Sequence, residues 1–422
     1  MVGMEKFIIE GPANLKGEVK ISGSKNAALP IIAATILKGG QYQISNVPEI
    51  TDIKNMLGIL NNLGAKTKLH HNICEIDTRK ISSYTPEIRK VQNIRASILL
   101  AGPLLSRFGR VILAHPGGCL IGARPVKTHF DAFMELGATI ESTEEYYEIE
   151  AKNLIGGKII LGEFSVTGTE NAIMVALSAK GITEIHLCAN EPHVTDFCQF
   201  LISMGAEIEG LGTHTIIVYG QNRLHETSYK IIPDQIEAGT FILATAATRG
   251  EVLVKNFMVE HHDILIKKLY DANINFQVLG SDKILVKSTT SIKPINIRTD
   301  VYPGFPTDLQ APFAVLLTQA EGSSEIYETM FEGRLNYINE LNKMGANGVI
   351  KNSHEATITG PTPLYGTTIN SLDLRSGATL IMAALIAEGK SVIKKADIID
   401  RGYENIEEKF NKLGANITRV TE

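Results

Sequence analysis

The chain has no tryptophan and only four cysteines among its 422 residues. Small domains that depend on disulfides carry far more cysteine for their length, so a disulfide framework is excluded. The longest apolar run, residues 27–37, has 11 residues and contains a proline, whereas a membrane-spanning helix needs about 20. The first residues lack the basic start and apolar stretch of a signal peptide. We therefore expect a protein of the reducing cytoplasm that has no membrane partner.

An excess of positive charge is also missing. Lysine and arginine number 41 against 46 aspartates and glutamates, which gives a formal net charge of −5. Proteins that bind long polyanions usually carry the opposite sign, so nucleic acid is not an expected partner. There is no Walker, dinucleotide-binding or nucleophile-elbow motif. The pairs His70-His71 and His261-His262 lack the spacing of a zinc site. We expect neither a cofactor nor a metal.

Glycine, by contrast, is abundant and marks an internal repeat. The tripeptide Leu/Met-Gly-Ala occurs five times, and Ala272-Asn273-Ile274 is a degenerate sixth copy. A second series of glycines follows alanine-rich runs, and both series span 350 residues in steps of 67–73. The first series consists of Gly64, Gly137, Gly205, Asn273, Gly345 and Gly414, and the second of Gly39, Gly109, Gly181, Gly250, Gly322 and Gly389. Two markers with one period predict six repeats.

Each repeat has the pattern of a βαβαββ unit. An apolar helix leads to a β-branched strand, and a second helix ends at the Leu-Gly-Ala cap before a pair of strands. Six such units predict an α/β protein of two domains. Residues 25–232 form one domain with repeats 1–3, and residues 1–24 plus 233–422 form the other with repeats 4–6. The strand-like Phe7-Ile8-Ile9 would complete the last repeat.

The repeats differ in their charged residues. Lys25, Arg95, Asp308 and Arg375 stand 14 residues before a glycine of the second series, at the predicted starts of the first helices. A cation there is unfavourable, because the N-terminus of a helix attracts negative charge. The starts of the second helices carry three arginines, which are Arg124, Arg334 and Arg401.

Equivalent positions of a pseudo-symmetric domain converge, so these cations are predicted to line one cleft. Guanidinium groups bind phosphate and carboxylate through paired hydrogen bonds. The predicted ligand is a small polyanion whose charge balances the helix-end cations. The alternative is that the charges form ordinary salt bridges at the surface.

The segment 114–125 differs from its counterparts because it places Cys119 among three glycines and two prolines. Such a loop is predicted to be exposed and able to fold over a ligand. The neighbouring Arg124 would raise the reactivity of the thiol. Cys74, Cys188 and Cys198 lie in strand or helix patterns and are predicted to be buried.

These motifs together resemble the UDP-N-acetylglucosamine 1-carboxyvinyltransferases, a family of enolpyruvyl transferases. The resemblance runs the whole length of the chain. It is carried by Gly23-Ser24-Lys25-Asn26-Ala27-Ala28-Leu29-Pro30, Arg95-Ala96-Ser97, Pro116-Gly117-Gly118-Cys119 to Arg124-Pro125-Val126, Phe305-Pro306-Thr307-Asp308, Asp373-Leu374-Arg375 and Asp400-Arg401-Gly402-Tyr403-Glu404.

The resemblance implies a fold of two inside-out α/β barrel domains, each of three βαβαββ repeats, with the active site in the cleft between them. It also implies a reaction that begins peptidoglycan precursor synthesis. The sugar 3′-hydroxyl of UDP-N-acetylglucosamine adds to C2 of phosphoenolpyruvate while C3 is protonated, and phosphate is then eliminated. The implied partners are these two small molecules and the inhibitor fosfomycin, an epoxide that mimics phosphoenolpyruvate.

The family motifs also imply the roles of individual residues. Cys119 would donate the proton to C3 and hold a covalent adduct, and Asp308 would be the base at the 3′-hydroxyl. Lys25, Arg124 and Arg401 would bind the phosphate of phosphoenolpyruvate, and Lys25 and Arg401 would be catalytic as well.

Other motif residues would bind or support. Asn26 would contact phosphoenolpyruvate from the same turn as Lys25. The implied residues for the sugar nucleotide are Arg95, Arg124, Pro125, Val126, Lys127, Thr128, Glu163, Phe164, Ser165, Val166, Asp308 and Met330. Arg334, Asp373 and Arg375 would support the site.

Two departures from the family pattern affect the sugar-nucleotide contacts. Glu163 stands where the family often has lysine, and Lys127-Thr128 replaces Asp-Leu. Two alternatives remain open at this point. One is the sister enzyme, enolpyruvylshikimate-phosphate synthase, and the other is a non-catalytic paralogue that binds the sugar nucleotide without turnover.

Overall fold

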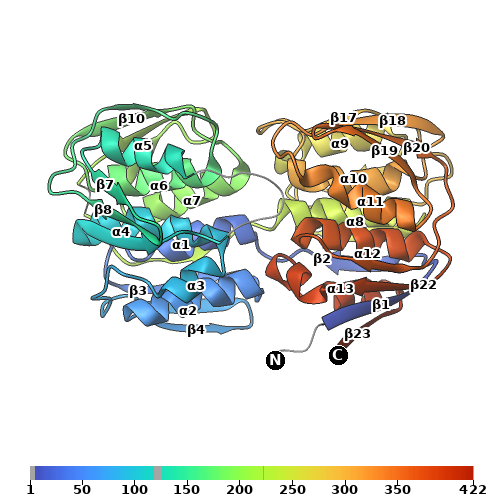
Figure 1. Cartoon of the computed structure of the whole chain (residues 1–422), viewed down its shortest axis with the longest axis horizontal. Helices are drawn as coiled ribbons and strands as arrows, with labels where there is room; N and C mark the ends of the chain where they lie inside the picture. The colour runs from blue at the N-terminus through green and yellow to red at the C-terminus, as the bar shows by residue number, and fades with distance from the viewer. Residues whose placement is uncertain (1–4, 118–125, 222, 422) are drawn as a thin grey trace. The chain divides into compact units, whose positions relative to one another are not determined.

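The computed structural model of the protein describes residues 5–117, 126–221 and 223–421. Its internal contacts divide these residues into two compact units. The first unit contains the chain up to Ser22 and from Pro233 onward, and the second contains the described residues between Gly23 and Ile232. Each unit has its own hydrophobic core. Figure 1 shows the course of the chain through both units.

The third repeat shows the predicted unit in full. Its elements are β9 (Lys158–Ile160), α6 (Val166–Ala176), β10 (Ile182–His186), α7 (Pro192–Ser203), β11 (Glu207–Glu209) and β12 (Thr215–Tyr219). The sheet order is β11-β12-β10-β9. The pair β9–β10 is parallel, because a helix connects the two strands, and the other pairs are antiparallel.

The other repeats of the second unit vary this plan. Repeat 1 contains α1 (Lys25–Ala34), β3 (Gln41–Ser45), α2 (Thr51–Leu63), β4 (Lys66–His70) and β5 (Ile73–Asp77), and takes its leading strand β13 (Ser228–Lys230) from the end of the unit. Repeat 2 contains α3 (Ile88–Gln92), the 3₁₀ helix η1 (Arg95–Leu100), α4 (Ala101–Phe108), β6 (Arg110–Ala114), α5 (Lys127–Glu135), β7 (Thr139–Ser142) and β8 (Tyr146–Glu150).

Repeat 2 differs from the predicted plan because its sheet has three strands in the described residues, in the order β6-β8-β7. Where a leading strand would run, a single hydrogen bond joins Ile112 N to the carbonyl oxygen of Tyr84 at 3.2 Å. The short helix α3 follows, and the predicted first helix is formed by η1 and α4 in direct succession.

The first unit contains three complete repeats. Repeat 4 has β2 (Lys16–Lys20), α8 (Gln235–Ala247), β14 (Glu251–Lys255), η2 (Val259–His261), α9 (Asp263–Asp271), β15 (Phe276–Val278) and β16 (Lys283–Val286). Repeat 5 has β17 (Ile297–Arg298), α10 (Thr307–Leu317), β18 (Gly322–Tyr327), η3 (Arg334–Asn336), α11 (Tyr337–Lys343), β19 (Asn347–Asn352) and β20 (Glu355–Gly360). Repeat 6 has β21 (Thr368–Asn370), α12 (Leu374–Ile386), β22 (Gly389–Lys394), η4 (Ala396–Arg401), α13 (Ile406–Lys412), β23 (Ile417–Thr421) and β1 (Glu5–Gly11).

The N-terminal strand β1 completes the last repeat, as its sequence predicts. It lies between β22 and β23 in the sheet order β21-β22-β1-β23. Phe7 faces Ile393 on one side and Arg419 on the other, and Glu5 faces Thr421. Phe7 is completely buried, so the two ends of the described chain are packed into one sheet.

The repeat marker has a direct conformational cause. Every residue of the first glycine series adopts a positive φ and ends a second helix: Gly64 (111°), Gly137 (100°), Gly205 (99°), Asn273 (62°), Gly345 (102°) and Gly414 (97°). This left-handed cap strongly favours glycine and admits asparagine. The interpretation of Asn273 as the sixth member of the series is therefore confirmed.

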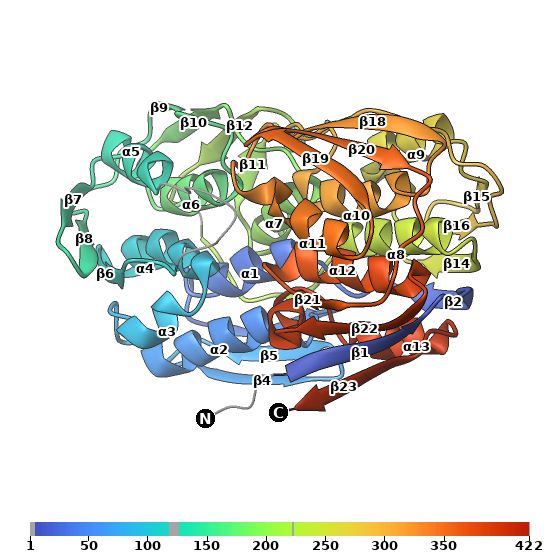
Figure 2. The ribbon, with the colours of Figure 1, turned by 45° about the vertical axis from the view of Figure 1, so that its right-hand side comes forward.

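The apolar first helices lie inside each unit and the sheets lie outside. Figure 1 and Figure 2 both show α8, α10 and α12 side by side, and these helices contact one another. Eleven consecutive residues of α12, from Arg375 to Leu385, are buried. Burial on all sides explains why these helices are apolar around their whole circumference.

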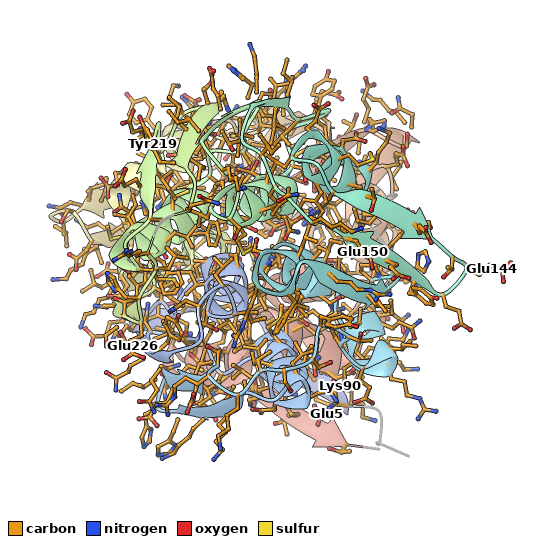
Figure 3. The ribbon with its side chains drawn as sticks, turned by 90° about the vertical axis from the view of Figure 1, so that its left-hand side faces the viewer. Glu5, Lys90, Glu144, Glu150, Tyr219 and Glu226 are labelled. Atoms are coloured by element: carbon orange, nitrogen blue, oxygen red, sulfur yellow. The ribbon has the colours of Figure 1, made fainter. Side chains whose placement is uncertain are left out.

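The sheets alternate between a buried and an exposed face. On β8, Ile149 is completely buried, whereas Glu150 lies partly open to solvent, and Figure 3 shows Glu144 projecting from the turn between β7 and β8. This period of two is expected for a sheet with one wet face. Among the described helices, none combines the length and apolarity needed to cross a membrane.

Candidate functional site

Lys25 opens α1 in the second unit. Ser24 caps the helix by accepting a hydrogen bond from Ala27 N at 3.3 Å. The Lys25 ammonium lies 2.6 Å from a carboxylate oxygen of Asp52, and the two side chains are 11% and 3% exposed. Asp52 holds the position in repeat 1 that arginines hold in repeats 2, 5 and 6. Asn26, the next residue, is partly buried.

The two segments predicted to bind the sugar nucleotide lie against each other. The hydroxyl of Thr128 on α5 donates to Glu163 Oε1 at 3.1 Å. Ser165 caps α6 by accepting a hydrogen bond from Gly168 N at 3.2 Å, and Val166 is the first residue of that helix. Lys127 is directed to Asp131 on its own helix, with Nζ–O distances of 2.6 and 2.7 Å.

The remaining predicted residues of this unit flank these segments. Val126 precedes α5, and Arg95 begins η1 with a partly buried side chain. Phe164 is exposed, and its ring lies 4.8 Å from the ring of His214. Cys119, Arg124 and Pro125 lie outside the described residues.

A buried histidine that the sequence analysis did not identify joins α5 to α6. His129 Nδ1 lies 2.8 Å from the amide nitrogen of Asn171, and Nε2 lies 3.2 Å from the hydroxyl of Thr167. Burial, followed by the positive charge of Arg95, lowers the pKa of His129 to about 3. The imidazole is therefore neutral at physiological pH and aligns the two helices that carry the segments above.

The three described cysteines are buried, as predicted. Burial raises the pKa of the Cys74 and Cys188 thiols to about 12 and raises that of Cys198 as well. Such thiols are poor nucleophiles, because the thiolate is the reactive form.

Asp308 lies at the start of α10 in the first unit, between two arginines. One carboxylate oxygen bonds to Nη2 of Arg334, and the other accepts a hydrogen bond from Nε of Arg375 at 3.0 Å. Both arginine side chains are at least 94% buried, while 25% of the Asp308 side chain is exposed. Burial alone would raise the pKa of Asp308, but the two guanidinium groups outweigh it and hold the pKa well below its usual range.

Arg375 extends this arrangement toward the Asp400–Glu404 motif. Its guanidinium carbon lies 5.1 Å from the centre of the Tyr403 ring, and the Tyr403 hydroxyl pairs with Thr240 on α8 at 2.9 Å. The Arg375 guanidinium also bonds to the Tyr403 side chain, and within the described part of the chain its buried Nη1 has no acceptor of its own. A buried donor without a partner is costly, so this nitrogen is suited to an acceptor supplied by a ligand.

The supporting residues are held by local hydrogen bonds. Asp373 caps α12 by accepting from Arg375 N at 2.8 Å and Ser376 N at 3.0 Å. Glu328, which the sequence analysis missed, is fully buried and accepts hydrogen bonds from Thr307 at 2.7 Å and Met330 N at 2.9 Å. It thereby connects the residue before Asp308 to the exposed Met330. Arg401 is the last residue of η4 and is partly buried.

The helix-end charges are balanced partly within the protein. The sequence analysis assigned the balancing charge to a ligand, but Asp52 provides it for Lys25, and Asp308 provides it for Arg334 and Arg375. The same two repeat positions carry Lys–Asp in repeat 1 and Asp–Arg in repeat 5. These three cations therefore form salt bridges, as the alternative has it, but the pairs are largely buried and do not lie at the surface.

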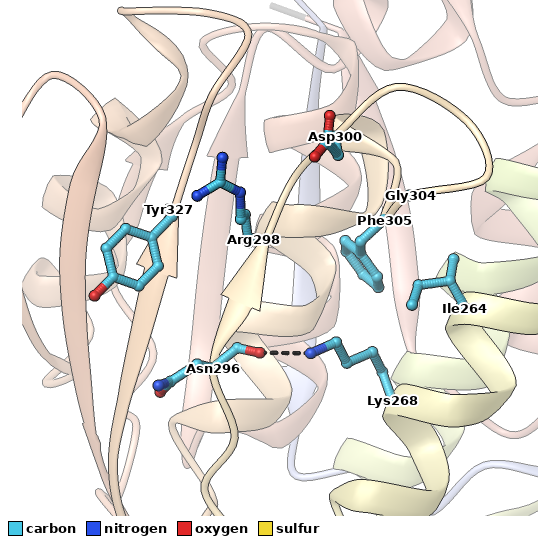
Figure 4. A pocket seen from close by; sticks show the side chains of 8 residues that line it. All are labelled: Ile264, Lys268, Asn296, Arg298, Asp300, Gly304, Phe305 and Tyr327. Atoms are coloured by element: carbon cyan, nitrogen blue, oxygen red, sulfur yellow. Dashed lines mark hydrogen bonds between the residues drawn. The ribbon is translucent and has the colours of Figure 1, made fainter.

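A separate pocket of about 430 Å³ lies in the first unit. Figure 4 shows its lining, where Lys268 donates to the carbonyl oxygen of Asn296 at 2.8 Å and Arg298 lies near Tyr327. None of the predicted site residues lines this pocket. In the same described residues, no group of three or more His, Cys, Asp or Glu side chains is arranged to hold a metal ion.

Comparisons with known proteins match almost the whole chain. The family model described as EPSP synthase (3-phosphoshikimate 1-carboxyvinyltransferase) matches residues 9–410. The chain is 43% identical to UDP-N-acetylglucosamine 1-carboxyvinyltransferase of Geotalea uraniireducens, covering 99% of this chain and 100% of that protein. It is 44% identical, with the same coverage, to UDP-N-acetylglucosamine 1-carboxyvinyltransferase 2 of Carboxydothermus hydrogenoformans.

Solved structures show the same fold. The enolpyruvyl transferase NikO from Streptomyces tendae has a TM-score of 0.91 at 24% identity, covering 100% of both chains. An EPSP synthase from Acinetobacter baumannii has a TM-score of 0.77 at 18% identity, covering 99% of this chain and 100% of that one.

Proposed function

The chain belongs to the UDP-N-acetylglucosamine 1-carboxyvinyltransferase family of enolpyruvyl transferases, and we propose that it transfers the enolpyruvyl group of phosphoenolpyruvate to the 3′-hydroxyl of UDP-N-acetylglucosamine. The family inferred from the sequence motifs is thereby confirmed. The reaction belongs in the cytoplasm, where it supplies a precursor of peptidoglycan.

The observation that best supports the chemistry is the carboxylate of Asp308 between two buried arginines. Arg375 offers a buried Nη1 that lacks an acceptor in the described residues, and Arg334 approaches from the other side. Phosphoenolpyruvate carries a carboxylate and a phosphate, both of which match guanidinium groups in geometry and charge. The arrangement therefore fits a base placed beside a binding site for a small polyanion.

In the proposed reaction, Asp308 accepts the proton of the 3′-hydroxyl while the hydroxyl oxygen forms a bond to C2 of phosphoenolpyruvate. Cys119 donates a proton to C3, so the double bond is lost and a tetrahedral intermediate forms. The Cys119 thiolate then takes back a proton from C3, the C–H electrons restore the double bond, and phosphate departs from C2 with the electrons of its C–O bond. Lys25, Arg124 and Arg401 bind the phosphate, Lys25 also assists proton transfer, and Asn26 contacts the substrate next to Lys25.

The low pKa of resting Asp308 requires a change on substrate binding. A general base works best when its pKa is near the working pH, and two adjacent cations make Asp308 a weaker base. An anionic substrate group next to Arg334 and Arg375 would offset their charge and raise the pKa of Asp308. Substrate binding would thus activate the base at the moment when it is needed.

The second unit supports the part of the proposal that concerns the sugar nucleotide. The contact between Thr128 and Glu163 joins the segments 126–128 and 163–166, which we propose to bind the nucleotide together with Arg95, Arg124 and Pro125. Met330, with Asp308, would contribute from the first unit. We therefore propose that one reaction uses residues of both units.

The test is phosphate release from phosphoenolpyruvate with each of two acceptors. We expect release with UDP-N-acetylglucosamine and none with shikimate 3-phosphate. Release only with shikimate 3-phosphate would support the sister enzyme. Binding of UDP-N-acetylglucosamine without release of phosphate would support a non-catalytic paralogue, and either result would refute the proposal.

Fosfomycin provides an independent test of Cys119. We expect the epoxide to alkylate Cys119 and no other cysteine, because burial raises the pKa of the Cys74, Cys188 and Cys198 thiols. Peptide mass spectrometry after incubation with fosfomycin and UDP-N-acetylglucosamine would locate the adduct. A Cys119→Asp variant should remain unmodified, and an adduct on another cysteine would contradict the assignment.

A further inference from the structure

The segment that carries Arg401 runs from η4 to the start of α13. Arg401 is the residue to which the proposed function assigns the phosphate of phosphoenolpyruvate. A guanidinium group binds phosphate well only when its orientation is fixed, because misplacement by about 1 Å costs much of the effect. The residues that fix this segment therefore matter for the reaction.

Arg419 on β23 forms a salt bridge with Asp400, the residue immediately before Arg401. Its Nη1 and Nη2 each lie 2.7 Å from one oxygen of Asp400, which forms a two-pronged pair. Its Nε donates to Glu407 Oε1 at 2.7 Å, and Nη1 also donates to Glu5 on β1. The guanidinium carbon lies 4.7 Å from the centre of the Phe7 ring. One side chain thus joins β1, β23, α13 and η4.

The charges around Arg419 make it hard to replace. Three carboxylates surround one guanidinium group, so without that group Glu5, Asp400 and Glu407 would repel one another. Burial raises the pKa of Asp400, and the bonds and positive charge of Arg419 oppose that rise. Removal of Arg419 would leave the partly buried Asp400 carboxylate without its counter-charge. Because an unpaired buried charge is costly, Asp400 would then move toward solvent or take up a proton.

A second anchor holds the other end of the segment. Glu404 accepts a hydrogen bond from the hydroxyl of Ser22, and that hydroxyl accepts one from Lys409 Nζ at 2.8 Å. Lys409 is in turn paired with the buried Glu237 on α8. Arg401 therefore lies between two fixed points, Asp400 and Glu404, in a segment that consists of the 3₁₀ helix η4 and a loop.

We propose that Arg419 is a positioning residue for Arg401, which it orients for the phosphate of phosphoenolpyruvate by clamping Asp400 to the last sheet. The inference rests on the proposed function, since it takes Arg401 as a phosphate ligand. Arg419 itself touches no substrate in this account.

The test compares four variants of the full chain. Arg419→Met removes the clamp, Arg419→Lys keeps the charge but not the two-pronged geometry, and Asp400→Asn weakens the clamp from the other side. Arg110→Met is the matched control, because Arg110 also pairs with two carboxylates, Glu148 and Glu150, and lies over the ring of Tyr84.

We expect Arg419→Met and Asp400→Asn to raise the KM for phosphoenolpyruvate by about tenfold, the loss of one charge-assisted hydrogen bond. The KM for UDP-N-acetylglucosamine should stay within about twofold of the wild-type value. Arg419→Lys should recover part of the loss, and Arg110→Met should change neither constant. A fall in kcat alone, or an equal rise of both KM values, would mean that Arg419 is merely structural and would overturn the proposal.

Hydrogen exchange of residues 396–405 provides a readout that does not depend on activity. We expect faster exchange there in Arg419→Met than in the wild type or Arg110→Met. Unchanged exchange would overturn the positioning role even if the enzyme is active. If the wild type releases no phosphate with UDP-N-acetylglucosamine, the proposed function fails, and the exchange result still decides whether Arg419 holds the segment. If Arg419→Met does not fold, Asp400→Asn and Arg419→Lys decide in its place.

Discussion

At the scale of single residues, the main feature is that charges at equivalent repeat positions are paired in opposite senses. Repeat 1 places lysine on the first helix and aspartate on the second, whereas repeat 5 places aspartate first and arginine second. Both repeats thus have a salt bridge between the first and second helix, but the positive and negative residues have changed places. In repeat 5 the two arginines offset the cost of burying the Asp308 carboxylate, so Asp308 remains ionised in the resting protein.

The role of Asp308 is tested by Asp308→Asn, which keeps the shape of the side chain but removes the base. General-base catalysis contributes about 10²–10⁴-fold, so we expect kcat and kcat/KM to fall together by about 10²-fold or more. The measurement is phosphate release at saturating and limiting substrate.

The matched control for this substitution is Glu325→Gln in the same repeat. It neutralises a carboxylate that pairs with Lys351 and is 29% exposed. Its activity should equal that of the wild type. A rise in KM with unchanged kcat in Asp308→Asn would assign Asp308 to binding and not to proton transfer.

His129 makes stability depend on pH. Its pKa falls from 6.5 in the unfolded chain to about 3 in the folded protein, chiefly through burial. Below pH 6.5 only the unfolded state binds the proton, so the stability is complete above that pH and is lost as the pH falls. The loss amounts to about 1.4 kcal/mol per pH unit.

We expect His129→Gln to lower the free energy of unfolding at pH 7.5 but to flatten its decline between pH 6.5 and pH 5. Urea unfolding at several pH values would measure this slope. The exposed His70→Gln variant should keep the slope of the wild type. An equally steep decline in His129→Gln would show that another group controls the pH dependence.

At the scale of elements, the N-terminus of α12 shows how a local motif serves the site. Asp373 and Ser376 form a capping box, in which each side chain bonds to the backbone N–H of the other. The cap fixes the first turn, and Arg375 is the second residue of that turn. Stability of the helix end and the position of the arginine are therefore coupled.

We expect Asp373→Ala to cost about 1 kcal/mol of stability, the usual value for a lost cap, and to reduce kcat/KM because Arg375 shifts. Asp373→Asn should keep most of both properties, since asparagine caps helices equally well. Thermal unfolding and phosphate release measure the two effects. If Asp373→Asn loses as much activity as Asp373→Ala, the negative charge of Asp373 and not its cap is what the site needs.

The elements also show how far the sequence predicts the fold. The helix ends at Gly64 and Asn273 were predictable because a left-handed helix cap restricts the residue type. Phe7 to Ile9 were recognisable as a strand. The missing leading strand of repeat 2 was not predictable. Its place is taken by residues near Tyr84 that carry no strong pattern of either kind.

The candidate site was predictable in its positions but not in its pairings. In the repeat alignment, Lys25 is equivalent to Asp308, and Asp52 is equivalent to Arg334. The alignment does not predict which residues pair with each other in the folded protein. Arg375 was predicted to line the cleft and support the site, and its bond to Asp308 was not foreseen. Glu328 and His129 were missed because each acts through hydrogen bonds to residues distant in sequence.

At the scale of the whole molecule, the two units differ in how the chain supplies their strands. The second unit draws every described strand, β3 to β13, from one continuous part of the chain. The first unit depends on both ends, because β1 and β2 precede the second unit and all other strands follow it. Since Glu5 faces Thr421 across neighbouring strands, a short loop could join the two ends.

We expect a permuted fragment, residues 233–421 followed by a short glycine-rich linker and residues 5–22, to fold as the first unit. A hairpin loop of 2–5 residues is long enough for adjacent antiparallel strands. Residues 233–421 alone should not fold, because they lack β1 with its buried Phe7 and Ile9. Circular dichroism during urea unfolding would compare the fragments, and an equally cooperative transition in both would contradict the expectation.

The position of β1 also sets an order of events during synthesis on the ribosome. Its neighbours β22 and β23 begin at Gly389 and Ile417, so β1 pairs with strands that are made about 400 residues later. At about 5–20 residues per second, β1 waits for tens of seconds, while the second unit acquires its final strand at Lys230. The nascent chain therefore completes the second unit first and carries an unpaired strand until β22 and β23 have been made. Charged residues at Glu5, Lys6 and Glu10 protect such a strand from pairing with other chains.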